Sequence, residues 1–555
     1  MSDTVVVELT RRGKLTVGEP YFVPSAPLML DRKGLGDARP GDLAVVSTGG
    51  GRGRPRLDRV LGPAKDIEAV LEGLLVHTGA RTQFEPYDLP EPTLEGRTDL
   101  RDLTTFTIDP ATAEDFDDAL SVREEQDGIR AWVHIADVSA HVAAGSPLDD
   151  GAATRAFTTY VPGRAAPMLP PALADDRCSL RPHEDRLTFT VEFPPRGEPL
   201  LYRSVIRSDA RLTYGQAERR EAEPAVASAL ELIDGLTARL RDRRFARGAL
   251  RIESPEIAFA FDGRGGIARA WKESEPTAHR LVEELMIAAN EAVAELLSSR
   301  HRATLYRIHE RPDPDSIELL LAKLADLDVP TPPAPDPLTP DAAAKVAAAT
   351  SERVMDYVGR TGRGREAFPA LVLRSLKQAR YDPRNLGHSG LASTAYCHFT
   401  SPIRRYPDLI VHRALLRELG LSDELVPGDL AALGDHTSMR EREVADHEYL
   451  ADALCLAWLL EAELFQRGWD AAWEGEIIGL IGAGIFVRFG EVFEGFLPSR
   501  RLGGDYFDVN VLGTALAGRR GGPSYRLGDG IRVRVEAIRR HEGKVELSPV
   551  GRTRE

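Results

Sequence analysis

One long stretch of mixed strand and helix patterns, from about residue 94 to residue 460, most limits the folds open to this chain. Strand-like apolar runs such as 131–138 alternate with helical patterns such as 278–299. Its one clear break is the segment 330–340, whose prolines exclude a helix and suit an exposed loop. The pattern predicts one large mixed α+β domain, which we place at residues 91–465.

Both ends of the chain differ from this central domain. Residues 1–90 combine short β-like runs with a helical pattern at 65–77, which predicts a small β-rich module with an appended helix. Residues 472–551 contain closely spaced strands broken by glycine-rich turns, which predicts a small β-barrel. The predicted fold class is therefore multidomain α+β, as the length of 555 residues requires.

Composition excludes several classes of protein. With 42% apolar and 28% charged residues and no long uncharged apolar run, the chain is expected to be globular, cytoplasmic, free of membranes and monomeric. Cys178, Cys397 and Cys455 lie too far apart for a disulfide framework or a zinc site. The net charge of −15 argues against a surface covered with nucleic-acid-binding groups, but arginines clustered at 49–59 and 401–407 allow phosphate binding inside a basic channel.

Four aspartates lie within ten residues, directly after an apolar run: Asp109, Asp115, Asp117 and Asp118. Like charges this close repel, and burying them is costly unless a cation neutralises them. Mg²⁺ is commonly held by a few carboxylates together with substrate phosphates, and paired metal ions promote hydrolysis of phosphodiesters. The cluster therefore predicts a divalent-metal site.

Two other structures compete for these aspartates. An acidic segment is usually a solvated surface turn. A calcium-binding EF-hand loop counted from Asp115 would need glycine at its sixth position and glutamate at its twelfth, where Gln126 stands. The calcium loop is a poor fit, whereas the local chemistry leaves the surface turn open.

Longer motifs decide between these structures. TIDPATAEDFDDALSV (107–122) and WVHIADVSAHV (132–142) resemble the signature of the ribonuclease II and ribonuclease R family of exoribonucleases. Further matching motifs follow in the same order at 158–173, 178–193, 281–290, 305–312 and 398–413. Several long motifs in one order are far more specific than one acidic cluster, and they imply that the large domain is an RNB catalytic domain.

The resemblance implies a processive, hydrolytic 3′-to-5′ exoribonuclease that needs Mg²⁺, or Mn²⁺ in its place, and degrades single-stranded RNA to nucleoside 5′-monophosphates. It leaves open whether structured RNA is degraded. It implies metal-binding roles for Asp109, Asp115 and Asp118, and a catalytic role for Asp117. Arg404 matches the arginine that contacts phosphate near the scissile bond, and a planar guanidinium suits that role.

The same resemblance implies several contacts to RNA. Tyr160 and Tyr214 match tyrosines near the terminal nucleotides, where stacking contributes about 1 to 3 kcal/mol per base and tolerates any base. Ile252 stands where the family has a second stacking phenylalanine, so the clamp on the terminal bases is expected to differ. Glu284, or Glu283 beside it, matches a glutamate near the RNA that could help to distinguish ribose from deoxyribose.

Both flanking modules are expected to bind RNA. Residues 472–551 resemble an S1 domain, an OB-type barrel for which Phe486, Arg488 and Phe496 are the predicted binding residues, with Phe489 in the core. The family usually carries two cold-shock barrels at the other end, and about 90 residues are too few for both. The N-terminal region is thus a shortened, atypical module, either one reduced cold-shock or OB barrel or a winged helix.

Three rival functions remain open on the sequence. A polynucleotide phosphorylase would also degrade RNA from the 3′ end and carry an S1 domain, but it would consume inorganic phosphate. A non-catalytic RNA-binding or remodelling protein is the main non-enzyme alternative, and the intact aspartates and Arg404 argue against it. A deoxyribonuclease is compatible with the metal chemistry alone.

Overall fold

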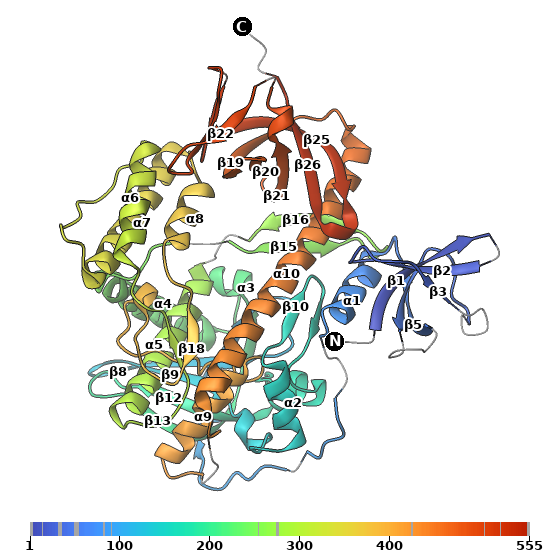
Figure 1. The fold of residues 1–555 in the computed structure, drawn as a ribbon. Coiled ribbons are helices and arrows are strands. Elements are labelled where there is room, and N and C mark those ends of the chain that lie inside the picture. Colours follow the sequence, from blue (N-terminus) through green and yellow to red (C-terminus); the bar gives the residue numbers. More distant parts are fainter. Residues whose placement is uncertain are drawn as a thin grey trace.

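The computed structural model describes residues 4–13, 15–30, 36–48, 55–80, 84–89, 91–252, 255–273, 277–422, 426–503, 505–521 and 523–551. A small sheet, a large central domain and a barrel lie around one long helix, α10 (Leu430–Arg467) (Figure 1). At about 1.5 Å per residue, its 38 residues extend about 57 Å. Helix α10 contacts elements of all three parts, so it holds them in a common frame.

The N-terminal module is a five-stranded antiparallel sheet with one helix, in agreement with the β-rich module and appended helix that the sequence predicts. Its strand order is β3-β2-β1-β4-β5, with bounds β1 (Thr4–Arg12), β2 (Leu15–Pro20), β3 (Leu28–Met29), β4 (Asp42–Ser47) and β5 (Arg56–Pro63). Helix α1 (Ile67–His77) begins where the Asp66 carboxylate accepts the N–H of Glu68 at 2.9 Å. The buried side of α1 packs on β1, β4 and β5, and α1 also contacts α10.

The central domain is built on a seven-stranded sheet in the order β14-β7-β8-β9-β12-β13-β6. Each edge strand is parallel to its neighbour: β14 pairs with β7 and β6 pairs with β13. The inner pairs are antiparallel. The bounds are β6 (Thr98–Asp99), β7 (Thr105–Asp109), β8 (Asp118–Glu125), β9 (Gly128–Ala136), β12 (Asp185–Phe193), β13 (Leu200–Arg207) and β14 (Ala210–Thr213).

Helices and loops cover both faces of this sheet. One apolar cluster joins Phe106, Leu120 and Val133 of the sheet to α4 (Pro224–Ala246) and α5 (Thr277–Ser299). A second cluster joins Ala119 and Ala136 to α2 (Pro147–Arg155) and α9 (Tyr406–Glu418). The ends of β7 and β8 are therefore fixed from both sides by buried packing.

The remaining elements of the large domain lie around this core. Helices α6 (Pro314–Asp326), α7 (Pro340–Thr361) and α8 (Ala367–Arg374) lie beside the barrel, and the proline-rich segment links α6 to α7 as a loop, as expected. The shorter elements are β10 (Thr159–Val161), β11 (Arg164–Ala166), α3 (Tyr214–Glu218), β15 (Ile257–Phe261), β16 (Ile267–Lys272), β17 (Tyr306–Ile308) and β18 (Arg380–Asp382).

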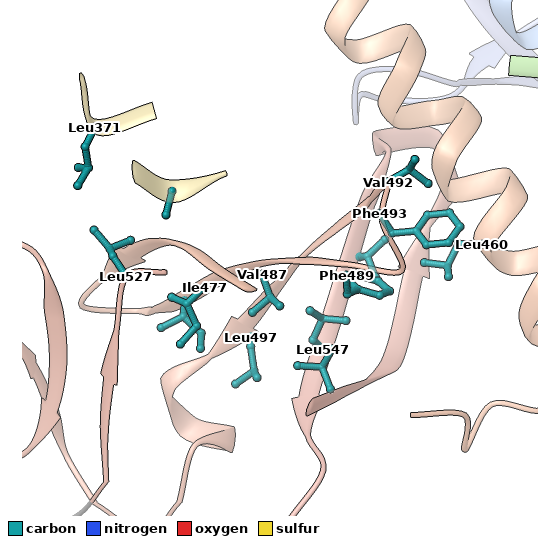
Figure 2. Packing of buried hydrophobic residues seen from close by; sticks show 14 of the residues in the cluster. Leu371, Leu460, Ile477, Val487, Phe489, Val492, Phe493, Leu497, Leu527 and Leu547 are labelled. Atoms are coloured by element: carbon teal, nitrogen blue, oxygen red, sulfur yellow. The ribbon is translucent and has the colours of Figure 1, made fainter. Parts of the chain in front are cut away.

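The C-terminal module is a closed barrel, which confirms the predicted OB-type fold class. Its strand order is β19-β20-β21-β26-β25, with bounds β19 (Trp473–Ile481), β20 (Gly484–Phe489), β21 (Phe493–Pro498), β25 (Gly530–Arg539) and β26 (Lys544–Pro549). Phe489 is 1% exposed, so its predicted place in the core is confirmed. Leu460 of α10 and Leu371 of α8 belong to the same apolar cluster (Figure 2). A smaller sheet of β22 (Phe507–Val509), β23 (Ala515–Gly518) and β24 (Ser524–Arg526) accompanies the barrel.

A half-buried carboxylate ties the barrel to the central domain. Glu476 of β19 accepts the backbone N–H groups of residues 365, 366 and 367 at 2.9, 3.1 and 2.9 Å. Those groups lie at the N-terminal end of α8, which begins at Ala367 after the N-cap Glu366, and a helix leaves its first N–H groups without internal partners. Arg363 and Asp529 form an ion pair of 2.9 Å between the same two parts. Glu476 therefore acts as an N-terminal cap supplied by another domain.

Glu476→Ala is expected to lower the free energy of unfolding by about 2 kcal/mol, because it removes the acceptor of three backbone donors at a partly buried interface. Urea denaturation measures this loss. Glu474→Ala on the same strand is the matched control, since the Glu474 side chain is 80% exposed and its loss should change little. Equal stability of the two variants would contradict the capping role.

The three cysteines are buried free thiols, as their spacing predicts. No helix in the described parts of the chain is both long enough and apolar enough to cross a bilayer.

Candidate active site

The ends of two neighbouring strands place Asp109 and Asp118. Strands β7 and β8 pair antiparallel, with Thr105 opposite Ser121, so β7 ends near the point where β8 begins. Asp109 is the last residue of β7 and Asp118 is the first of β8, and the loop between them carries Asp115 and Asp117. The fold therefore converts a cluster in sequence into a cluster at one edge of the sheet.

The surroundings of Asp109 and Asp118 disfavour the ionised form of both carboxyl groups. Asp109 is 9% exposed, and its Oδ2 has no hydrogen-bond partner. Burial, together with a smaller contribution from the negative charge of Asp115, raises the pKa of Asp109 to about 6. Burial also raises the pKa of Asp118 to about 7, with a further contribution from the charge of Asp109. A cation between these groups would remove the repulsion that raises both values.

The residues present fit a divalent metal that is only partly enclosed by protein. Among the described residues, no three His, Cys, Asp or Glu side chains lie close enough together to form a full metal-binding group. Mg²⁺ needs fewer protein ligands than that, because it keeps several waters and often binds through one or two carboxylates and a substrate phosphate. The buried, unpartnered oxygen of Asp109 and the raised pKa of Asp118 are consistent with such a site.

Without divalent metal, wild-type protein is expected to lose stability relative to Asp118→Asn as the pH rises from about 4 to about 7. The pKa of Asp118 is higher in the folded chain than its ordinary value of 3.8, so folding takes up a proton across this interval, and ionisation then favours unfolding. Urea denaturation in EDTA at a series of pH values gives the difference, expected to be on the order of 2 kcal/mol. Added Mg²⁺ should restore wild-type stability at pH 8. A difference between the two proteins that stays constant with pH would contradict the raised pKa.

Asp117 joins the aspartate loop to a segment nearly 300 residues away. Its Oδ1 accepts the N–H of Ile403 at 2.9 Å, and its Oδ2 accepts Nε–H of Arg404 at 3.3 Å. The Asp117 side chain is 3% exposed, whereas that of Arg404 is 45% exposed. Burial raises the pKa of Asp117 well above its ordinary range, and the charge of Arg404 opposes that shift. Asp117 therefore anchors the guanidinium while leaving part of it free to contact a ligand.

Tyr160 lies on the open side of the same cluster. Its hydroxyl donates to Oδ2 of Asp115 at 2.5 Å, and its side chain is partly exposed. The backbone N–H of Thr158 bonds to the carbonyl of Arg404 at 3.0 Å, which fixes the Tyr160 strand beside the arginine. The structure therefore brings together Asp115, Asp117, Arg404 and Tyr160, which the sequence analysis selected from distant motifs.

Tyr214 lies at the start of α3, beside the end of β7. Strand β14 pairs in parallel with β7, with Thr213 opposite Asp109. Burial raises the pKa of Tyr214, and the negative charges of Asp118 and Asp109 raise it further, which places its hydroxyl near both carboxylates. Tyr214 thus belongs to the same group of residues.

Two residues of this region were missed by sequence reasoning. Arg211 lies three positions before Tyr214, and its positive charge lowers the pKa of Asp109. Glu448 of α10 accepts the backbone N–H of Tyr160 at 2.7 Å. The motif around Tyr214 could have indicated Arg211, whereas no local signal distinguishes Glu448 from other acidic residues of a long charged helix.

Two further predicted RNA contacts, Glu284 and Ile252, are engaged in contacts within the protein. The carboxylate of Glu284 is 2% exposed and pairs with the guanidinium of Arg244 on α4, with Nε at 3.2 Å. It is occupied inside the domain, and neighbouring Glu283 also lies near Arg244, at 3.6 Å. Ile252 is half-buried and packs against the large apolar cluster that includes the barrel core. The part of Glu284 and Ile252 in RNA binding stays a prediction.

The predicted binding residues of the barrel share one outer face. Phe486 and Phe496 are opposite each other on β20 and β21, and their ring centroids lie 5.1 Å apart. Arg488 pairs across the same strands with Glu494 at 3.2 Å. Both rings are half-buried, so one edge of this aromatic pair faces solvent.

Comparison with known proteins identifies the domain that carries these residues. The model of the RNB domain matches residues 97–420, more than half of the chain. The chain belongs to the RNB family. The resemblance found in the sequence motifs is therefore confirmed.

Relatives and solved structures agree with this assignment. The chain is 36% identical over 525 residues to ribonuclease R of Escherichia coli, and the match covers 87% of this chain and 63% of that protein. It is 32% identical to ribonuclease R of Vibrio parahaemolyticus, with coverage of 99% and 70%. A structure of Mycoplasma genitalium RNase R in complex with ribose-methylated single-stranded RNA superposes with a TM-score of 0.86 at 23% identity, covering 99% of this chain and 89% of that one. The chain thus has the RNB fold but spans less than two thirds of the E. coli relative.

Proposed function

We propose that this chain is a hydrolytic 3′-to-5′ exoribonuclease that depends on a divalent metal, with Mg²⁺ as the expected ion. The observation that carries the proposal is the half-exposed side chain of Arg404, which buried Asp117 holds and whose charge acts on the Asp109 and Asp118 carboxyl groups. A phosphate bound there would contact both Arg404 and a metal ion held by Asp109 and Asp118. That combination suits phosphodiester hydrolysis.

Each residue has a distinct part in this proposal. Asp109 and Asp118 would hold the metal, and the family resemblance adds Asp115 as a further ligand; the metal when bound supplies Lewis-acid stabilisation of charge on the phosphate. Arg404 binds phosphate oxygens through its planar donors, and Asp117 fixes its orientation. The partly exposed ring of Tyr160 offers a stacking surface for the terminal base. The 3′-to-5′ polarity, processive action and release of nucleoside 5′-monophosphates follow from the family resemblance.

We infer that single-stranded RNA is the partner and that the flanking modules guide it to the site. The proposed divisions are residues 1–90, 91–465 and 472–551, and the last division falls where α10 ends and β19 begins. The Mycoplasma genitalium protein, which has the same fold, was solved with single-stranded RNA bound. The aromatic pair Phe486 and Phe496 offers a second stacking surface for RNA on the barrel.

The nature of the products tests this function. Purified protein is incubated with Mg²⁺ and RNA of mixed sequence, with and without inorganic phosphate, and the released nucleotides are separated. The proposal requires nucleoside monophosphates under both conditions, and DNA of the same sequence should remain intact. Nucleoside diphosphates that appear only with phosphate would indicate a phosphorylase instead. Equal cleavage of DNA would indicate a nuclease without sugar selectivity.

A further inference from the structure

An exposed tyrosine lies on α10 between the barrel and the candidate active site. Tyr449 is 66% exposed, an unusual state for an aromatic residue in a helix that supports three domains. The sequence analysis assigned it no role, so its position on the helix is the evidence to consider.

The face of α10 that carries Tyr449 is the face that the barrel covers. Residues 449, 453, 456 and 460 follow the i, i+4, i+7, i+11 spacing of one helical stripe. Leu460 is fully buried in the cluster that includes Phe493 of the barrel (Figure 2). Ala453 lies against the turn between β25 and β26, where a Cβ added at Gly543 would come within 2.7 Å of the Ala453 Cβ. Tyr449 is therefore the first residue of this stripe beyond the edge of the barrel.

The charged neighbours of Tyr449 belong to the outer face of the barrel. Burial raises the pKa of the Tyr449 hydroxyl. The negative charge of Glu494 raises it further, and the positive charge of Arg488 lowers it. Glu494 and Arg488 form the cross-strand ion pair that lies next to Phe486 and Phe496 on the same two strands. Tyr449 thus borders the aromatic face of the barrel.

The residue next to Tyr449 on α10 contacts the candidate active site. Glu448, the adjacent residue, accepts the backbone N–H of Tyr160 at 2.7 Å, and Tyr160 in turn bonds to Asp115. Asp452 lies between Glu448 and Tyr449 around the helix, and burial followed by the charge of Glu448 raises its pKa to about 7. Glu448 and Asp452 offer a phosphate no positive charge on this turn of α10, so a nucleic-acid strand passing here would present its bases to α10 and turn its backbone away.

From this arrangement we propose that Tyr449 is a base-stacking residue that supports single-stranded RNA midway between the Phe486–Phe496 pair and Tyr160. This inference rests on the proposed function, since it assumes that RNA runs from the barrel to the carboxylates. The ring supplies a flat surface for any base, and its neighbours exclude the phosphate backbone from the helix side. The nucleotide bound there lies upstream of the scissile bond, so Tyr449 contributes to affinity for long RNA and not to the chemical step.

Tyr449→Ala is expected to weaken binding of long single-stranded RNA about tenfold, the loss of one base stack. Affinities are measured by fluorescence anisotropy in EDTA, which prevents turnover, with a 5′-labelled oligouridine long enough to reach the barrel. Tyr449→Phe should bind as wild type does, because stacking needs the ring and not the hydroxyl. Tyr506→Ala is the matched control, since Tyr506 is 70% exposed and lies beside the separate β22–β24 sheet.

A short oligouridine that fills only the region near Tyr160 should be hydrolysed by Tyr449→Ala at the wild-type kcat/KM. A second readout separates stacking from a structural role. When single abasic nucleotides are placed along the long RNA, one position should weaken wild-type binding while adding no further loss to Tyr449→Ala. The proposal is overturned if Tyr449→Ala binds long RNA as wild type does, if Tyr449→Phe is as weak as Tyr449→Ala, or if every abasic position has additive effects. Wild-type protein that binds RNA but does not hydrolyse it would instead refute the proposed function.

Discussion

Asp117→Asn is expected to abolish hydrolysis, with kcat lowered about a thousandfold or more, while RNA affinity stays nearly unchanged. The asparagine oxygen can still accept the Ile403 N–H, so the segment around Arg404 should keep its position. The substitution removes the negative charge of the buried Asp117 carboxylate, which orients the Arg404 guanidinium. Single-turnover rates and anisotropy measurements on the same RNA give both quantities.

Asp176→Asn provides the control for this substitution. Asp176 lies at the surface, with its side chain 58% exposed, so replacing it tests the general effect of removing one acidic charge. Turnover at the wild-type rate by Asp117→Asn would remove Asp117 from the catalytic residues. A large fall in RNA affinity would show that the residue acts mainly in binding.

Arg404→Lys is expected to lower kcat about a hundredfold, although it preserves the positive charge. Lysine lacks the planar arrangement of donors that allows Arg404 to bond to Asp117 through Nε and to Ser401 through a terminal nitrogen at 3.1 Å. A compact ammonium at this position cannot hold both partners and also offer two parallel donors to a phosphate. Steady-state kinetics should show the fall in kcat with a smaller change in KM.

Arg247→Lys is the matched control for this change. The Arg247 side chain is 46% exposed and pairs with Glu291 at 2.8 Å, so its exposure and its ion pairing resemble those of Arg404. It is the C-cap residue of α4 and pairs with a carboxylate outside the aspartate cluster, so its replacement should leave kcat unchanged. A fully active Arg404→Lys would mean that charge alone is needed and that the fixed geometry has no catalytic consequence.

The sequence predicted those features of the site that depend on short segments. Four aspartates after an apolar strand indicated a cation-binding edge, and the strand ends at Asp109 and Asp118 have the expected burial and raised pKa. The motif around Arg404 was recognised on its own. Its bond to Asp117, across 287 positions of the chain, required the folded structure.

Predictions for single helical residues were less secure for a physical reason. A glutamate on a helix can face a ligand, solvent or another helix, and the sequence pattern does not distinguish these cases. Glu284 faces Arg244 inside the domain, where the paired charges compensate each other's burial. Glu448 and Tyr449 border the site from α10, but the 38-residue helix shows no local change that would have indicated them.

In the flanking modules too, the sequence predicted the strands and helices but not how they pack against the rest of the protein. Alternating apolar residues predicted the strands of the barrel, and Phe489 is buried as expected. The N-terminal sequence predicted strands and one helix, but it did not reveal that α1 packs against α10. Contacts between domains depend on complementary surfaces, which periodicity within one segment does not encode.

The most direct test of the account follows the RNA itself through a time course. RNA labelled at its 5′ end is incubated with wild-type protein in Mg²⁺, in EDTA, and with Asp117→Asn in Mg²⁺, and the labelled fragments are separated by length. The account predicts progressive shortening from the 3′ end with wild-type protein in Mg²⁺ and intact RNA in both other reactions. Internal fragments without a 3′-end ladder, or equal degradation in EDTA, would contradict it.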